Sequence, residues 1–174
     1  RAGRADPIRS FAGIPPMRIV FLGAPGSGKG TQASRLRTEL GLAHISTGDL
    51  LRAAVGAGTP LGLKAKAVME SGNLVSDEIV LGMLEERIAQ PDAHAGFILD
   101  GYPRNLAQAD ALGKLLARIG QPMDHAVQLE VDTDKLVDRL AGRAQAEGRA
   151  DDNPESVRNR LNIYNDQTAP VIDF

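Results

Sequence analysis

Short apolar runs alternate along this chain with longer amphipathic stretches. The runs are rich in β-branched residues and predict strands at residues 18–22, 43–45, 96–100 and 126–131, all but the second of them fully buried. Strands that alternate with helices form a parallel sheet covered on both faces, with ligands at the carboxyl ends of the strands. We therefore predict an α/β fold of three layers, α/β/α.

Helix start and stop signals frame the amphipathic stretches. Asn105, with Gln108 three residues later, and Asn153, followed by Pro154, are N-terminal caps, while Gly41 ends a helix. The predicted helices cover residues 29–40, 77–90, 106–119, 133 onward and 154–164. The apolar residues expected to face the core include Leu106, Ile119 and Val137.

Residues 47–75 differ from these stretches because glycine and proline interrupt them repeatedly. We predict a small, hinged subdomain of broken helical turns, rather than core. The interruptions are Gly56, Gly58, Pro60, Gly62 and Gly72.

The totals of the 174-residue chain fit one globular domain, over residues 17–174, with an ordinary hydrophobic content of 43%. A formal charge of −2 argues against a nucleic-acid binder with a basic surface, and charged residues interrupt every apolar run that could span a membrane. The absence of cysteine excludes disulfides and thiolate zinc sites and fits a reducing compartment. We expect a cytoplasmic monomer, and we interpret residues 1–16 as an upstream arm or cloning remnant rather than a transit peptide.

A glycine-rich loop, Gly23-Ala24-Pro25-Gly26-Ser27-Gly28-Lys29-Gly30-Thr31, joins the first strand to the first helix. Glycines let backbone amides approach a phosphate closely, the helix start adds partial positive charge, and Lys29 supplies a full charge. The usual pattern has Ser or Thr directly after the lysine, whereas here Gly30 intervenes and the hydroxyl comes at Thr31. The alternative is an ordinary strand-to-helix turn, but the flanking elements favour nucleotide binding.

Asp100 ends a buried strand, the position from which a carboxylate orients Mg²⁺ or its waters. The alternative is that it only caps the turn that follows, and we favour the magnesium role because the usual hydroxyl ligand is displaced. His44, His94 and His125 lack the spacing of a metal site, so we expect them in the core or on the surface.

Six arginines are candidates to surround the loop lysine. Two of them share a helix face at spacing i and i+4. Phosphoryl transfer requires much positive charge to stabilise the equatorial oxygens of the moving group, which such a set provides. Ion pairing with Asp138, Asp151 and Asp152 on a solvated face is the alternative for any single arginine. The six are Arg52, Arg104, Arg139, Arg143, Arg149 and Arg160.

From about Met17 to its last residue, the chain resembles the adenylate kinases, nucleoside monophosphate kinases of the phosphate-loop class. The resemblance rests on the Gly30-Thr31 ending of the loop, on Ser46-Thr47-Gly48-Asp49-Leu50-Leu51-Arg52, on Asp100-Gly101-Tyr102-Pro103-Arg104 and on the later arginines. It implies a P-loop NTPase-type core with five parallel strands, an AMP-binding subdomain at residues 47–75, and reversible transfer of a phosphoryl group from MgATP to AMP, giving two ADP.

The resemblance also implies roles for the residues that match the motifs. Asp100 would meet Mg²⁺ through water, no zinc is expected, and the Tyr102-Pro103 bond would be cis. The catalytic residues would be Lys29, Arg104, Arg143, Arg149 and Arg160. ATP would be bound by Gly26, Ser27, Gly28, Lys29, Gly30, Thr31, Arg139 and Arg143. AMP would be bound by Thr47, Arg52, Asn73, Leu74, Val75, Gly101, Tyr102, Pro103, Arg104, Gln108, Arg149 and Arg160.

The chain departs from the family in two places. Only a short lid loop, residues 144–149, fits between two of the arginines. The sequence stops at Phe174, before the final edge strand and helix of the family, so we expect that strand to be missing.

Two other functions stay open. UMP/CMP kinases resemble this family but typically carry Ala at the position of Thr47 and Asn at that of Gln108, so these residues favour AMP. A nucleotide-binding module without catalysis is the second alternative. An Asn-Lys-x-Asp motif for guanine, which a GTPase would have, is absent from the sequence.

Overall fold

The computed structural model describes residues 15–174, so the predicted arm lies almost entirely outside the described residues. Within the described range, four strands alternate with seven α-helices. The strands are β1 (Met17–Gly23), β2 (Ala43–Ser46), β3 (Gly96–Asp100) and β4 (His125–Leu129). The helices are α1 (Lys29–Leu40), α2 (Thr47–Gly56), α3 (Pro60–Glu70), α4 (Asp77–Ile88), α5 (Leu106–Arg118), α6 (Thr133–Glu147) and α7 (Pro154–Ile163). Short 3₁₀-helices lie at η1 (Pro91–Ala93), η2 (Ala150–Asp152) and η4 (Ala169–Asp173), and η3 (Tyr164–Thr168) is a π-helix.

All strand pairs are parallel, and the order across the sheet is β2-β3-β1-β4. β1 lies beside β3 with Phe21 opposite Asp100, and β2 lies beside β3 with Ser46 opposite Asp100. The loops that follow β1, β2 and β3 therefore leave the same edge of the sheet, which confirms the predicted α/β fold.

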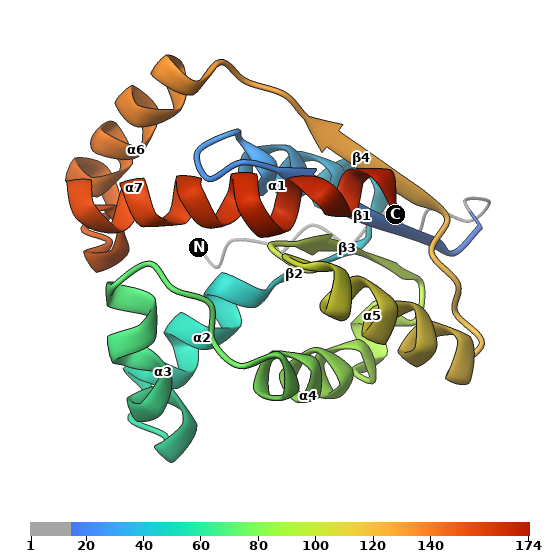
Figure 1. Ribbon diagram of the computed structural model, residues 1–174. Coiled ribbons are helices and arrows are strands. Elements are labelled where there is room, and N and C mark those ends of the chain that lie inside the picture. Colours follow the sequence, from blue (N-terminus) through green and yellow to red (C-terminus); the bar gives the residue numbers. More distant parts are fainter. Residues whose placement is uncertain (1–14) are drawn as a thin grey trace, which may run out of the picture.

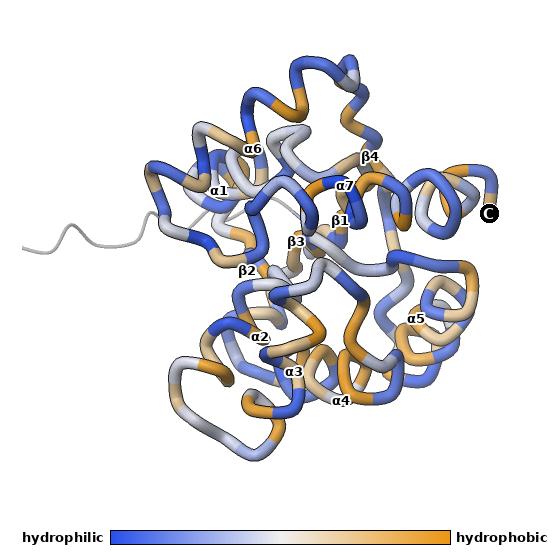
Figure 2. Tube along the Cα trace, turned by 60° about the vertical axis from the view of Figure 1, so that its left-hand side comes forward, coloured by the Kyte–Doolittle hydropathy of each residue, from blue (hydrophilic) through white to orange (hydrophobic). Residues whose placement is uncertain are grey.

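Two apolar clusters cover the two faces of the sheet. On one face, Val20 and Leu99 pack with α4 and α5, and on the other, Phe21 and Ile98 pack against Ala33 of α1. Figure 1 shows the strands between these helices, and Figure 2 shows hydrophobic residues recurring along α4 and α5. Successive side chains of a strand point to opposite faces, so the continuous apolar runs read from the sequence belong to strands buried on both sides.

The prediction that β4 is buried is wrong. Most of its residues are exposed, and Val127 retains 39% of its accessible surface. Within the described residues β4 pairs with β1 on one side only and is therefore an edge strand. Its apolar composition is similar to that of a central strand, so the composition did not predict this position. The expected core positions Leu106, Ile119 and Val137 are likewise exposed, because they lie at a helix end or on the solvent side of a helix.

The glycine-rich stretch contains two helices, α2 and α3, separated between Gly56 and Pro60 as predicted, but Gly62 lies within α3 and does not interrupt it. α3 begins with Thr59, whose hydroxyl accepts from the Gly62 N–H at 3.0 Å, and with Pro60 in its first turn. A Cβ at Gly62 would lie 2.1 Å from the carbonyl oxygen of Ala54 in α2. Gly62 is therefore needed for close packing of α2 against α3 and does not end a helix.

Other sequence predictions can be compared directly with the described residues. Asn105 and Asn153 accept hydrogen bonds from the backbone of the helices that they cap, and the Tyr102-Pro103 bond is cis, as predicted. In the segment 144–149, helix α6 continues through Glu147. Gly148 ends the helix in a left-handed conformation with φ 62°. The loop at the predicted lid is thus shorter than its predicted span.

None of the helices in the described part of the chain combines the length and the apolar character needed to cross a membrane.

Candidate active site

A cavity of about 940 Å³ opens at the carboxyl edge of the sheet. This volume lies near the upper end of the range of about 300–1,000 Å³ typical of small-molecule sites. Every site residue predicted from the sequence lines it except Pro103, which lines an adjoining cavity of about 60 Å³. Seven cationic and four acidic side chains face the large cavity. The cations are Lys29, Arg52, Arg104, Arg139, Arg143, Arg149 and Arg160, and the acids are Asp49, Asp100, Glu147 and Asp151.

The glycine-rich loop forms one wall of this cavity. Gly26 and Gly28 have positive φ angles of 80° and 99°, which side chains would disfavour, and α1 begins at Lys29. Lys29 Nζ donates to the carbonyl oxygens of Gly23 at 2.8 Å and Ala24 at 2.9 Å. These bonds hold the ammonium against the loop that leads into α1, and the N-terminus of a helix favours an anion.

The pKa of Lys29 is lowered to about 8, mainly by burial of the ammonium. The charge of Asp100 raises this pKa in part, and the charges of nearby arginines lower it further. An ammonium in water has its pKa near 10.5, so the site disfavours this charge while no anion is bound. A phosphate beside Nζ would favour the charged form again. An anionic ligand on this wall would therefore be favoured, because it would stabilise the buried ammonium of Lys29.

Asp100 lies above the same loop, at the end of β3. Its Oδ2 lies 3.2 Å from Nε2 of His44. A Cβ added at Gly30 of the loop would lie 3.5 Å from the same oxygen, so the carboxylate is close to the start of α1. Both side chains are largely buried, with 13% and 12% of their surface accessible. From the sequence, His44 was predicted only as a core or surface residue, because the histidines are not spaced like metal ligands. Its contact with Asp100 was not predicted.

The opposite wall is organised around the carbonyl oxygen of Gly101. It accepts from Thr47 Oγ1 at 2.9 Å and from Arg104 Nε at 2.7 Å. Among residues 15–174, Arg104 makes no ion pair with a carboxylate within 4.0 Å. Burial, followed by repulsion from Arg160, lowers the pKa of Arg104 to about 10. The guanidinium stays charged at neutral pH and is available to an anion.

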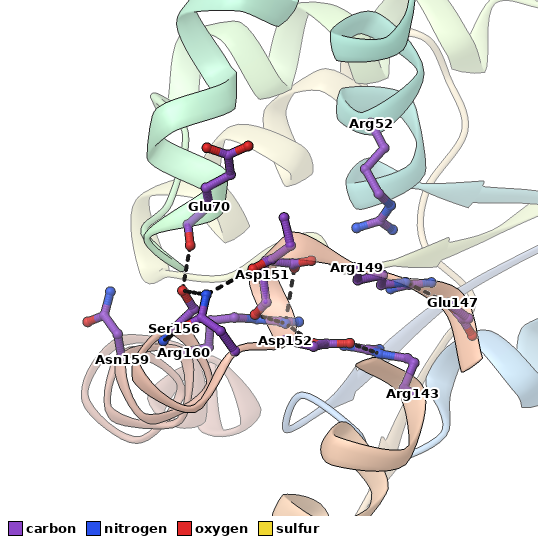
Figure 3. Close-up of polar contacts among 12 residues, drawn as sticks. Arg52, Glu70, Arg143, Glu147, Arg149, Asp151, Asp152, Ser156, Asn159 and Arg160 are labelled. Atoms are coloured by element: carbon purple, nitrogen blue, oxygen red, sulfur yellow. Dashed lines mark hydrogen bonds and ion pairs between the residues drawn. The ribbon is translucent and has the colours of Figure 1, made fainter. Parts of the chain in front are cut away.

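Arg143 and Arg160 form a cluster with the acids of η2 (Figure 3), whereas Arg52 pairs with Asp49 of its own helix. Asp152, whose side chain is fully buried, accepts from Arg143 Nε and Nη2 at 2.6 Å each and from Arg160 Nη1 at 2.8 Å. Asp151 lies 3.1 Å from the same Arg160 nitrogen. Arg149 pairs with Glu147 at 2.6 Å, and Arg52 points toward it from α2. Pairing with Asp151 and Asp152, the alternative interpretation, is thus real for two arginines, yet both still face the cavity.

The electrostatics of this cluster differ from residue to residue. Burial alone would raise the pKa of Asp152, but its hydrogen bonds with Arg143 and the charges of Arg143 and Arg160 lower it. Burial would lower the pKa of Arg143, and Asp152 raises it instead. Burial, joined by repulsion from Arg143, leaves the pKa of Arg160 lowered. One buried carboxylate therefore orients two guanidiniums through charge-assisted hydrogen bonds.

Polar contacts also join α7 to the end of α3, and we call them the α3–α7 clasp (Figure 3). Ser156 Oγ donates to the carbonyl oxygen of Glu70, and Asn159 Nδ2 donates to the Ser71 carbonyl oxygen at 3.0 Å and to Asn73 Oδ1 at 2.8 Å. The clasp fixes the segment that leads into the cavity-lining residues 73–75 relative to the helix that carries Arg160.

Sequence reasoning missed His44, the clasp and the central place of Asp152. His44 lies two residues before the end of β2, opposite Ile98, so its contact with Asp100 depends on the register of β2 against β3, which the sequence does not give. Nothing in the sequence indicated that Ser156 and Asn159 reach α3. Such contacts join residues 86 to 88 positions apart, which only the folded chain brings together.

Comparison with known proteins agrees with this geometry. The family model described as adenylate kinase matches residues 21–174. Adenylate kinases of Stenotrophomonas maltophilia (strain R551-3) and Xanthomonas campestris pv. campestris (strain 8004) are each 68% identical to the chain over 158 residues. Each alignment covers 91% of this chain and 84% of the relative. The phosphate loop, the arginine cluster and these matches together show that the chain belongs to the adenylate kinase family.

Proposed function

We propose that the protein is an adenylate kinase that reversibly transfers a phosphoryl group from MgATP to AMP, giving two ADP. The observation that carries the proposal is a single cavity lined by both the loop lysine and four further cations, Arg104, Arg143, Arg149 and Arg160. Such a site can hold two phosphorylated ligands together and neutralise the charge between them. The relatives that are 68% identical to the chain are named adenylate kinases.

The phosphates of ATP bind, in this proposal, to the backbone N–H groups and Lys29 of the loop. Transfer proceeds in line, and the cations stabilise the charge that spreads over the equatorial oxygens of the moving group. Arg104 contributes a guanidinium that meets no carboxylate within residues 15–174 and donates to Gly101, whereas Arg143 and Arg160 are oriented by Asp152. Little covalent help is needed from the protein, so no general base is assigned.

We assign the two nucleotides to opposite walls of the cavity. ATP lies along the loop, residues 26–31, with Arg139 beside its adenine. AMP lies in the subdomain of residues 47–75 and against Gly101, Arg104 and Gln108. Residues 144–149, at the end of α6, close over ATP. What supports this division is that each set lines the same cavity from separate elements of the fold.

The residues near the loop fit a magnesium ion brought in with ATP. Asp100, a largely buried carboxylate beside the start of α1, and the Thr31 hydroxyl line the cavity, and hard oxygen donors suit Mg²⁺. When bound, the ion would neutralise phosphate charge. Asp100 would hold it through water, and His44 would keep the carboxylate in place.

We also propose that the protein acts as a monomer in the cytoplasm and on no nucleic acid. A mildly acidic chain without cysteine is consistent with these assignments. Size-exclusion chromatography with light scattering checks the oligomeric state, and an elution at twice the monomer mass would contradict it.

The function is tested with a panel of monophosphates. Purified protein is supplied with MgATP and AMP, UMP, CMP or GMP, and ADP formation is followed by a coupled assay. We expect AMP to give the highest kcat/KM. Faster turnover of UMP than of AMP would replace the assignment with a UMP/CMP kinase, and nucleotide binding without ADP formation would indicate a non-catalytic binding module.

A further inference from the structure

The buried side-chain amide of Gln108 is held from two sides at the edge of the cavity. Gln108 belongs to the first turn of α5 and only 2% of it is exposed. Its Nε2 donates to Asp77 Oδ1 at 2.7 Å, and its Oε1 accepts from the backbone N–H of Arg104 at 2.7 Å. The side chain also lines the large cavity.

These two partners allow only one orientation of the amide. An ionised carboxylate accepts hydrogen bonds and cannot donate, whereas a peptide N–H donates and cannot accept. Turning the amide by 180° would place Oε1 against the Asp77 carboxylate and Nε2 against the Arg104 N–H. Asp77 and the Arg104 backbone thus determine which end of the Gln108 amide is the donor.

Half of the hydrogen-bonding capacity of Gln108 remains for a ligand. A primary amide has two N–H donors and two acceptor positions, and one of each is engaged here. Adenine presents an acceptor, N1, beside a donor, the 6-amino group. Hypoxanthine presents the reverse, a donor at N1–H beside an acceptor at O6. An amide of fixed orientation matches one of these edges, whereas an amide free to turn matches either.

Asp77 is well placed to fix the amide without being part of the cavity wall. It opens α4, where the helix start favours a negative charge, and Asn105 Nδ2 donates to its Oδ1 at 3.3 Å. Its residue surface is exposed on the outer side, so a substitution there leaves the core packing unchanged.

We propose that Asp77 is a positioning residue that sets the choice of base, by fixing the Gln108 amide so that the site accepts adenine and rejects hypoxanthine. The inference rests on the proposed function, since it concerns the AMP subsite. It assigns discrimination to a carboxylate outside the cavity that acts through another side chain.

The test compares Asp77→Asn with the wild-type protein. Asn keeps the shape of the side chain but also offers an N–H group, so only the Arg104 N–H still distinguishes the two ends of the Gln108 amide and the preference for one orientation weakens. We expect the ratio of kcat/KM for AMP to that for IMP to fall by about tenfold, as one hydrogen-bond preference is lost. The KM for ATP stays unchanged. Glu78→Gln, which removes a neighbouring acidic charge from the same helix turn, is the matched control and keeps the wild-type ratio.

A double-mutant cycle separates positioning from a structural role. In a Gln108→Met background the amide is absent, so Asp77→Asn should no longer change the AMP to IMP ratio. A ratio that stays at the wild-type value in Asp77→Asn would overturn the proposal, and so would an equal change in the Gln108→Met background.

Calorimetric titration with AMP and with IMP keeps this test independent of catalysis. If the wild-type protein forms no ADP, the proposed function fails. The role of Asp77 still stands if AMP binds more tightly than IMP and Asp77→Asn removes the difference. It falls if the wild-type protein binds both monophosphates equally.

Discussion

The two walls of the active-site cavity are built in different ways. The phosphate loop, residues 23–31, is one continuous segment whose lysine is held by carbonyl groups five and six residues away. In the arginine cluster, Arg143 of α6 and Arg160 of α7 are joined through Asp152 of η2, and Arg104 of the loop after β3 lines the same wall. The first wall depends on local backbone conformation, and the second depends on how distant helices pack. Five experiments test this difference.

The largest effect is expected from Lys29→Met. The variant removes the charge that faces the ATP phosphates but keeps a side chain of similar length, so kcat/KM should fall by about 10³-fold. Circular dichroism should show an unchanged fold. Lys114→Met, at a side chain that is 76% accessible, is the control and should retain wild-type activity. Activity of Lys29→Met within tenfold of wild type would refute the role of the loop lysine.

Asp152→Asn should have the next largest effect, because it disrupts the second wall only. Two guanidiniums lose their shared carboxylate, so kcat should fall by about 10²-fold through misplacement. The free energy of unfolding should fall by about 3 kcal/mol, since charges that were paired are left uncompensated. Asp138→Asn, on an exposed position of α6, is the control. Unchanged kcat with a lower melting temperature would show that Asp152 is only structural.

The pH dependence of the Asp152 contribution follows from the sign of its pKa shift. The folded pKa lies below the ordinary value of 3.8, so the carboxylate stabilises the fold fully above that value. This contribution is lost as the pH falls from 3.8 through the folded pKa. Urea titrations of wild type and Asp152→Asn should therefore converge in acid.

A pH titration probes the first wall without a mutation. Lys29 titrates near pH 8 in the free protein, and a bound phosphate raises its pKa, so ATP binding takes up a proton above pH 8. The KM for ATP should rise above pH 8 by at most about tenfold per pH unit, while kcat at saturating ATP changes less. A KM that stays constant up to pH 10 would contradict this reading of the loop.

The smallest effect is expected at the α3–α7 clasp. Ser156→Ala combined with Asn159→Ala removes three hydrogen bonds between α7 and the end of α3. Because residues 73–75 would then be less well positioned, the KM for AMP should rise by about threefold to tenfold. The KM for ATP should be unaffected. Equal increases for both nucleotides would show that the clasp supports the cavity as a whole.

The features that depend on contacts within a few residues were predicted from the sequence, and those that depend on long-range packing were not. The phosphate loop and the caps at Asn105 and Asn153 depend on residues within a few positions of one another, and these predictions agree with the structure. The exposure of β4, the complete helix α3 and the helical residues 144–147 were not foreseen, because packing partners decide them. Gly62 is the clearest case, since its role is set by Ala54 of another helix.

The sequence by itself determined the alternation of strands and helices, the phosphate loop, the family and many, but not all, of the residues that line the cavity. Tertiary structure decided which charges remain free. Arg104 meets no carboxylate in the described residues, Arg143 and Arg160 share Asp152, and His44 contacts Asp100. The physical reason is that Coulomb and hydrogen-bond energies depend on distance and burial, which sequence spacing gives only within one helix or turn.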